Sequence, residues 1–298
     1  SLWPVILIFI GLSMFGATSW WGKVLGVIVA LFVALLVIGA LLGGSPIIGV
    51  NLTGNVVEEE REVASFSRIS LEGVGSMVVE EGDQESLIVR ADEALLNRIT
   101  TEVSNGKLTL RFTNPLFQFL LFNNAEIEYL ITVSDVESIS ISGAGSVKSS
   151  GIETDTLEVS VNGSGDVELA VTVEEFIARV SGSGRYLMAG TADRQVVHIN
   201  GSGKYFGSDL VSNETGVRIS GSGEVEVHVE EELNASINGS GRIRYLGEPF
   251  ISNSSISGSG SIERFDTSVN DVLKDSRVLD RLRRIDEVEE FNIDGGSA

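Results

Sequence analysis

The hydrophobic pattern near the start of the chain differs from that of the rest. Residues 24–42 form an uncharged, mostly apolar run of about the length that spans a bilayer as a helix. A shorter apolar run, residues 2–15, precedes it, and Trp20, Trp21 and Lys23 lie between the two. Indole rings favour the membrane interface and lysine favours the cytoplasmic side. The pattern predicts two transmembrane helices with a cytoplasmic loop, and a signal peptide is the alternative interpretation.

Beyond residue 136 the pattern becomes an alternation of apolar and polar positions, which is typical of strands with one buried face. Val159 with Val161, and Val197 with Ile199, are examples. A Gly-x-Gly motif follows such strands, and successive motifs begin 18 to 20 residues apart. The motif glycines are Gly143, Gly145, Gly163, Gly165, Gly182, Gly184, Gly201, Gly203, Gly221, Gly223, Gly239, Gly241, Gly258 and Gly260.

A repeat of about 19 residues is too short to fold alone, but it suits one coil of a solenoid, in which each coil buries its apolar face on the next. The glycines then mark repeated corners, where the backbone needs positive φ or close approach. The residue before each motif alternates between Ser and Asn, which fits a stacked ladder. We therefore predict an all-β fold with a parallel β-solenoid. An antiparallel sandwich or barrel built of hairpins is the alternative.

Residues 63–135 lack the regular spacing of Gly-x-Gly motifs. We predict that they form an antiparallel β cap on the solenoid. The Asn-Gly pair at 105–106 is a strong signal for a hairpin. Residues 92–99 suit a helical turn, and Gly-Val-Gly at 73–75 fits a degenerate first corner. The predicted divisions are a transmembrane hairpin (1–44), a linker (45–62), the cap (63–135), the solenoid (136–265) and a C-terminal helix with a tail (266–298).

One apolar segment, Pro-Leu-Phe-Gln-Phe-Leu-Leu-Phe, interrupts the predicted cap. Its large side chains include Phe117, Phe119, Leu120 and Phe122. An exposed cluster of this kind marks a contact with a partner subunit or a membrane surface, and this is the functional hypothesis for these residues. The alternative is an ordinary strand packed on the open end of the solenoid.

Charge and composition narrow the possible functions. The net charge of −21 argues against a nucleic-acid partner. The absence of cysteine excludes disulfides, zinc ribbons and thiol catalysis. His198 and His228 match no metal template, and no catalytic or phosphate-binding motif occurs. Glu224 and Glu226 share one strand face, as calcium ligands would, but the residues that follow the motifs vary in charge. We expect no metal, no cofactor and no enzymatic activity.

The order of these elements is similar to that of a known family. The run REVASFSRISLEGVGSMVVEEGDQESLIVRADEALLNRITTEVSNGKLTLRF, followed by SGAGSV and NGSGDV, resembles the putative autotransporter adhesin, head GIN domain. The resemblance covers residues 61–265 and implies a β-helical, secreted or surface-exposed protein without established catalytic residues. Separately, LWPVILIFIGL resembles the membrane region of LiaF-type envelope-stress proteins.

Together these features predict a non-catalytic, membrane-anchored protein that displays a β-solenoid for surface adhesion or envelope scaffolding. The expected partners are the lipid bilayer, through the N-terminal helices, and a protein or glycan ligand; self-association into a homo-oligomer is also considered. We expect the protein at the cell membrane, with its β domain extracytoplasmic. Two alternatives stay open. One is an envelope-stress sensor or regulator that binds protein partners, and the other is a carbohydrate-active β-helix enzyme with a carboxylate-lined cleft.

Overall fold

The computed structural model of the chain describes residues 54–113 and 126–265. Among these residues no helix is long and apolar enough to cross a bilayer. Several predictions fall outside the described residues and stay predictions. They are the membrane hairpin with Trp20, Trp21 and Lys23, the apolar segment with Phe117, Phe119, Leu120 and Phe122, and the C-terminal helix and tail at 266–298.

The described residues are mostly β-strand, as their alternating pattern predicts. The irregular part holds β1 (Val56–Arg61), β2 (Arg68–Gly73), β3 (Ser76–Glu81), β4 (Ser86–Asp92), α3 (Glu93–Leu96), β5 (Ile99–Ser104), β6 (Lys107–Phe112), β7 (Ile127–Val133) and β8 (Ser138–Gly143). The regular part holds β9 (Ser146–Gly163), β10 (Asp166–Gly182), β11 (Arg185–Gly201), β12 (Lys204–Gly221), β13 (Glu224–Gly239), β14 (Arg242–Leu246), β15 (Phe250–Gly258) and β16 (Ser261–Arg264).

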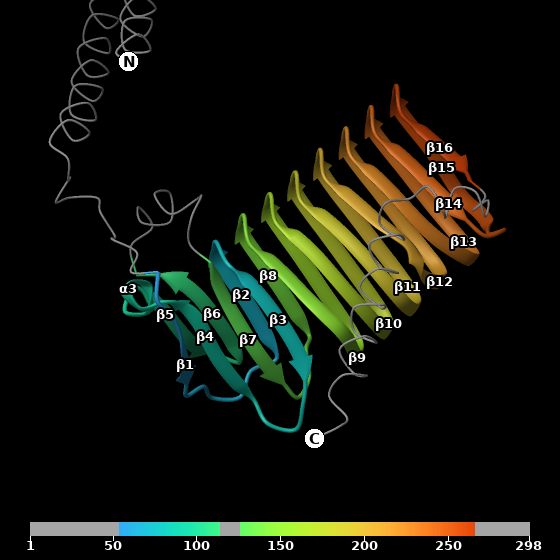
Figure 1. Cartoon of the computed structure of the whole chain (residues 1–298). Coiled ribbons are helices and arrows are strands. Elements are labelled where there is room, and N and C mark those ends of the chain that lie inside the picture. The colour runs from blue at the N-terminus through green and yellow to red at the C-terminus, as the bar shows by residue number, and fades with distance from the viewer. Residues whose placement is uncertain (1–53, 114–125, 266–298) are drawn as a thin grey trace, which may run out of the picture. The chain divides into compact units, whose positions relative to one another are not determined.

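From β9 to β13, each regular coil is a single long strand that bends once and ends at a Gly-x-Gly corner (Figure 1), and the next coil is divided into β14 and β15. Neighbouring coils pair in parallel along nearly their whole length, which confirms the predicted parallel β-solenoid. We call the stacked segments that follow each corner sheet I, and those that lead into the next corner sheet II. In β13, residues 224–228 belong to sheet I and pair with β14, whereas residues 232–239 belong to sheet II and pair with β15.

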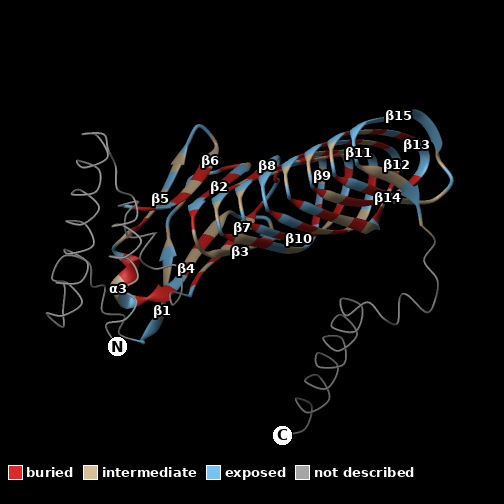
Figure 2. Cartoon of the chain, turned by 90° about the horizontal axis from the view of Figure 1, so that it is seen from above, coloured by how far each residue is buried: buried red, intermediate tan, exposed pale blue. Residues whose placement is uncertain are grey.

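The core lies between sheet I and sheet II, where every second side chain is buried (Figure 2). In β10, two consecutive outward residues, Glu174 and Glu175, interrupt this alternation, so the buried side changes phase and the strand bends there. Side chains of the two sheets meet in the interior: the Tyr186 hydroxyl of sheet I donates to the Val159 carbonyl of sheet II at 3.0 Å. Because equivalent residues lie in register, each coil buries its apolar side chains against those of its neighbours.

The prediction of an antiparallel cap over residues 63–135 requires a correction. β2 pairs in parallel with β8, and β3 pairs in parallel with β9, so these two strands are the arms of a first coil. Gly73 and Gly75 form its corner, with φ of 139° and 138°, which confirms the first corner predicted at 73–75. The chain then forms β4 to β7 on the N-terminal side of this coil and reaches its C-terminal side only at β8. Ser140 therefore donates a hydrogen bond to Ser70 at 3.0 Å across 70 residues of sequence, which hid this coil from the repeat spacing.

Among the described residues, antiparallel pairing joins only β1 to β4, β4 to β7 and β5 to β6. β6 and β7 themselves pair in parallel with β2 and β3, so these strands extend the N-terminal end of the stack. The predicted hairpin is confirmed, and Asn105 and Gly106 both have positive φ, at 51° and 71°. The predicted helical turn is α3, whose N-cap Asp92 accepts a hydrogen bond from the Ala94 N–H at 2.9 Å.

The C-terminal end of the stack is formed by β15 and β16. Each pairs on one side, with β13 and β14 respectively, and no described strand pairs with the other side. Phe250 is 73% exposed and Ile256 is 45% exposed on β15. The two ends of the solenoid therefore differ, because additional strands continue the sheets at the N-terminal end.

Candidate functional site

The first glycine of each motif is fixed by backbone conformation. These glycines have φ between 123° and 139°, a region that side chains with a Cβ avoid. A Cβ on Gly163 would lie 2.2 Å from the Gly143 carbonyl oxygen of the preceding coil. That oxygen accepts a hydrogen bond from the Ser164 N–H at 2.9 Å, so it cannot move away without loss of the link between coils.

The second glycine of the motif is fixed by packing instead, because φ is positive there only at Gly75 among the described corners. A Cβ on Gly165 would lie 2.9 Å from the Gly145 oxygen and 3.0 Å from Cγ2 of Ile141. The motif thus combines two separate requirements, one conformational and one steric. The structure stacks all the predicted corner glycines from Gly143 to Gly260 in successive coils.

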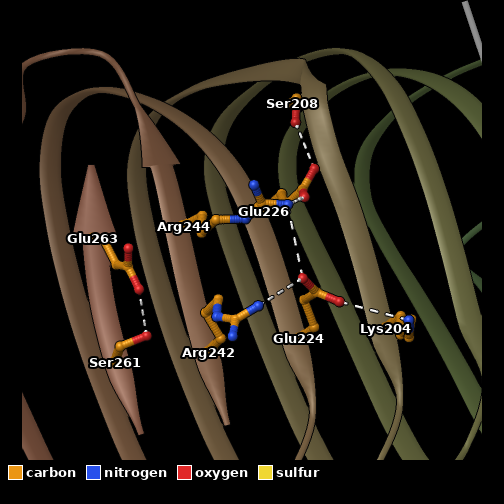
Figure 3. Close-up of polar contacts among 8 residues, drawn as sticks. All are labelled: Lys204, Ser208, Glu224, Glu226, Arg242, Arg244, Ser261 and Glu263. Atoms are coloured by element: carbon orange, nitrogen blue, oxygen red, sulfur yellow. Dashed lines mark hydrogen bonds and ion pairs between the residues drawn. The ribbon is translucent and has the colours of Figure 1, made fainter. Parts of the chain in front are cut away.

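The outer face of sheet I carries acidic and basic residues that form ion pairs between neighbouring coils. Glu224 lies 3.6 Å from Nζ of Lys204 on one neighbouring coil and 3.8 Å from Nη1 of Arg242 on the other (Figure 3). The pattern continues along the face, where Asp166 lies 3.8 Å from Arg185. Exposed pairs of this kind contribute about 0–1 kcal/mol each. Their larger effect is to leave this face with little unpaired charge.

Glu226 is the exception on this face because only 3% of its surface is exposed. It pairs with Arg244, and the Ser208 hydroxyl donates to it at 3.2 Å (Figure 3). The Arg244 guanidinium also lies over the Phe265 ring, 5.1 Å from its centre. Glu224 and Glu226 therefore bind neighbouring cations of the chain, and the two carboxylates considered as calcium ligands are engaged in ion pairs.

The outer face of sheet II has a different composition. Its row beside the corner alternates between Ser and Asn in register, and all its members are exposed. The next row begins and ends with serines, and the third row has small, apolar and amide side chains at its centre and C-terminal end. The rows are Ser142, Asn162, Ser181, Asn200, Ser220, Asn238, Ser257; Ser140, Ser160, Arg179, His198, Arg218, Ser236, Ser255; and Ser138, Glu158, Ile177, Val196, Gly216, Asn234, Asn253.

Three basic side chains occupy the centre of the middle row. Arg179, His198 and Arg218 are register partners on β10, β11 and β12. Arg179 pairs with Glu158 at 2.7 Å, and its Nη1 lies 3.1 Å from Nδ1 of His198. Partial burial, together with the positive charges of Arg179 and Arg218, lowers the pKa of His198. Arg218 has no ion pair within the described part of the chain.

A groove follows the bend between the two sheets on the side opposite the corners. Its lining includes the carboxylates of Glu81, Glu153, Asp155, Glu174 and Asp193. Some of these are already hydrogen-bonded: Glu81 accepts from the Glu153 N–H at 2.8 Å, and Asp193 accepts from an amide of the next coil at 3.4 Å. Successive coils contribute similar acidic residues, so no pair is set apart as acid and base.

Polar side chains inside the solenoid bond to one another. Gln195 donates to the Tyr205 hydroxyl and accepts from Thr215 at 3.3 Å. Thr215 in turn contacts the Ser212 hydroxyl at 2.6 Å. All four residues are buried, and burial raises the pKa of Tyr205. The hydrogen bonds of this network satisfy the polar groups that interrupt the apolar core, and its buried residues are closed to ligands.

The basic row was missed by sequence reasoning, although the signal was present. Arg179, His198 and Arg218 each lie three residues before the first glycine of a motif, so the repeat places them at one position of successive coils. Taken singly, His198 matches no metal template and gives no sign of a site. Aligning the repeats on their glycines would have identified its two arginine neighbours.

The fold and these faces define a class of protein, a β-solenoid with rows of polar side chains on its outer surface. The chain belongs to the family described as putative auto-transporter adhesin, head GIN domain, which matches residues 65–249. The family inferred from the sequence is thereby confirmed. The match begins after the N-terminal runs, so their LiaF-type resemblance stays a prediction. The comparison with curated proteins finds no match.

Solved structures share the fold. A putative adhesin from Bacteroides fragilis NCTC 9343 is 24% identical, with a TM-score of 0.66 over 73% of this chain and 100% of that chain. A putative lipid binding protein from Parabacteroides distasonis ATCC 8503 is 25% identical, with a TM-score of 0.58 over 72% of this chain and 98% of that one. A putative adhesin from the same species is 21% identical, with a TM-score of 0.59 and the same coverage.

Proposed function

We propose that this protein is a non-catalytic adhesion protein of the cell envelope that binds a glycan through the outer face of sheet II. The observation that carries the proposal is the Ser and Asn row beside the corners, exposed and in register on successive coils. Hydroxyl and amide groups both donate and accept hydrogen bonds, as sugar hydroxyls do. A repeated row offers many weak contacts to a polymer, and such contacts add through effective concentration.

The apolar N-terminal runs support attachment to a membrane, with Trp20, Trp21 and Lys23 at its interface. Protease treatment of intact cells tests the sidedness of the β domain. If the protein is an adhesin, protease added outside the cells should cleave the β domain. Protection of the domain would favour the alternative role, an envelope-stress regulator that binds protein partners.

Glycan binding is tested with the full chain in non-ionic detergent on an array of neutral and acidic polysaccharides. We expect retention by at least one polysaccharide and at least a tenfold loss when Asn162, Asn200 and Asn238 are all replaced by alanine. The matched control replaces Ser146 and Ser261, in the corner row of sheet I, by alanine. Equal retention of the Asn variant, or no retention of the unchanged chain, would refute the proposal.

Two other functions have weaker support. A carbohydrate-active enzyme needs one carboxyl held neutral beside an ionised partner, whereas the groove repeats equivalent carboxylates along the stack. Lipid binding is suggested by the description of one structural relative, but the net charge of −21 opposes anionic headgroups. Incubating the chain with a polysaccharide and measuring reducing ends tests the first, and vesicle co-sedimentation of the β domain tests the second.

A further inference from the structure

We infer that Arg179, His198 and Arg218 form a subsite for the anionic group of an acidic sugar unit. This inference rests on the proposed function and names the class of glycan that the same face binds. The three residues are consecutive in one row, so their Cα atoms are spaced by about 4.8 Å from coil to coil. Serines occupy the same row on both sides, at Ser160 and Ser236, so the basic side chains form a bounded group.

The hydrogen bonding makes the group a set of donors. A guanidinium has no acceptor, so Arg179 Nη1 must donate to Nδ1 of His198 across their 3.1 Å separation. The proton of the neutral imidazole is then on Nε2, which is left to donate to a ligand. Arg218 contributes a whole guanidinium without a carboxylate partner among the described residues. A carboxylate or sulfate accepts several such bonds at once.

The electrostatics also favour an anion. Stacked positive groups repel one another, and the carboxylate that pairs with this group among the described residues, Glu158, lies against Arg179 at its N-terminal end. On sheet I, by contrast, the cations of the two rows next to the corner all have a carboxylate partner. Exposed charges farther away than a Debye length of about 8 Å are largely screened, so the groups next to the row contribute most to binding at the surface.

The neighbouring rows indicate that the anion belongs to a sugar. On the corner side lie Ser181, Asn200 and Ser220, which hydrogen-bond hydroxyl groups. On the other side lie Ile177, Val196 and Gly216, which are half-buried and mostly apolar. A charged group flanked by hydrogen-bonding groups and a shallow apolar strip matches a uronic acid or sulfated sugar. A free anion would use only the central row.

The test uses the full chain in non-ionic detergent, with a galacturonate hexamer as the probe and its fully methyl-esterified form as the uncharged control. Isothermal titration should show binding of the acid at least tenfold tighter than that of the ester. Arg218→Ser should weaken binding of the acid about tenfold or more and leave that of the ester unchanged. Serine is chosen because Ser236 occupies the equivalent position in the next coil.

Arg185→Ser on sheet I is the control variant, because it changes the net charge equally in a row that also ends in serines. It should bind the acid like the unchanged chain. Equal affinity for acid and ester would overturn the subsite but not the glycan-binding proposal. Equal weakening by both variants would assign the effect to net charge. Competition by sodium sulfate at the molar concentration of the hexamer would indicate a site for free anions and would also overturn the inference.

Discussion

The two outer faces of the solenoid are built by the same repeat yet handle charge in different ways. On sheet I, the cations of the row beside the corner each lie next to a carboxylate on an adjoining coil: Arg185 pairs with Asp166, and Lys204 and Arg242 pair with Glu224. On sheet II, three basic residues follow one another and the rest of the row is serine. Sheet I therefore resembles a stabilised structural surface, whereas sheet II exposes hydroxyl and amide groups, as the proposed glycan site requires. Register alone does not determine function; the order of charges along each row does.

The largest expected effect is at the corner that joins sheet I to sheet II. Gly163→Ala places a Cβ 2.2 Å from the Gly143 oxygen at a φ of 135°. We expect it to lower the free energy of unfolding by about 3–5 kcal/mol, because strain and overpacking add. Chemical denaturation measures this. Gly216→Ala is the control, since nothing lies within 4 Å of its added Cβ. Its effect should be neutral or stabilising by about 0.4–1 kcal/mol.

The next prediction breaks the charge balance of sheet I. Glu226→Gln removes the carboxylate that pairs with Arg244. Only 3% of the surface of Glu226 is exposed. We expect a loss of about 1–3 kcal/mol in the free energy of unfolding, because the Arg244 guanidinium loses its buried charged partner and keeps only the longer contact with Glu224 at 3.7 Å. Asp166→Asn breaks a fully solvated pair on the same face and should cost less than about 1 kcal/mol. Similar losses for the two variants would contradict a special role for Glu226.

The third prediction makes sheet II resemble sheet I. Ser236→Glu introduces a carboxylate on the coil next to Arg218. We expect a gain of about 0.2–1 kcal/mol in the free energy of unfolding, because opposite charges on adjacent strands attract. The same change should weaken binding of the acidic hexamer, since Arg218 acquires an internal partner. A variant that gains stability and binds the hexamer as before would separate Arg218 from the ligand.

The smallest expected effect is the pH dependence contributed by His198. Its pKa is lowered in the folded state, whereas the unfolded side chain titrates near its ordinary value of 6.5. Just below that pH the unfolded chain binds more protons, so the free energy of unfolding falls as pH decreases until the folded pKa is reached. His198→Ser should remove this part of the decrease. Denaturation at several pH values in weakly binding buffer measures it, and identical profiles would contradict the shift.

Much of the fold could be predicted because the signals are local. Alternation around Val159 and Val161 identified a strand with a buried side, and the spacing of Gly163, Gly182 and Gly201 identified the coil. The pairing of β2 and β3 could not be predicted with the same ease, because their neighbours in space lie about 70 residues away in the sequence. A periodic pattern in the sequence does not indicate pairing between strands so far apart in the chain.

The candidate face was harder to predict than the corners for a different reason. A glycine at a corner is required by its own backbone, so one position is informative. Arg218 can be recognised as part of a site only because His198 lies beside it on the preceding coil. On the following coil its register partner is Ser236 and not a carboxylate. That information resides in the alignment of three repeats.

The excursion between β3 and β8 also bears on the order in which the protein folds. Later coils contact neighbours about one repeat away, so their contacts close short loops, whereas the first coil must close one of about 70 residues. Loop-closure entropy grows by about 0.6 kcal/mol for each doubling of length, so the first coil is disfavoured by roughly 1 kcal/mol relative to the others at the outset. The regular coils are therefore expected to assemble first and to serve as the template on which β2 and β3 dock late.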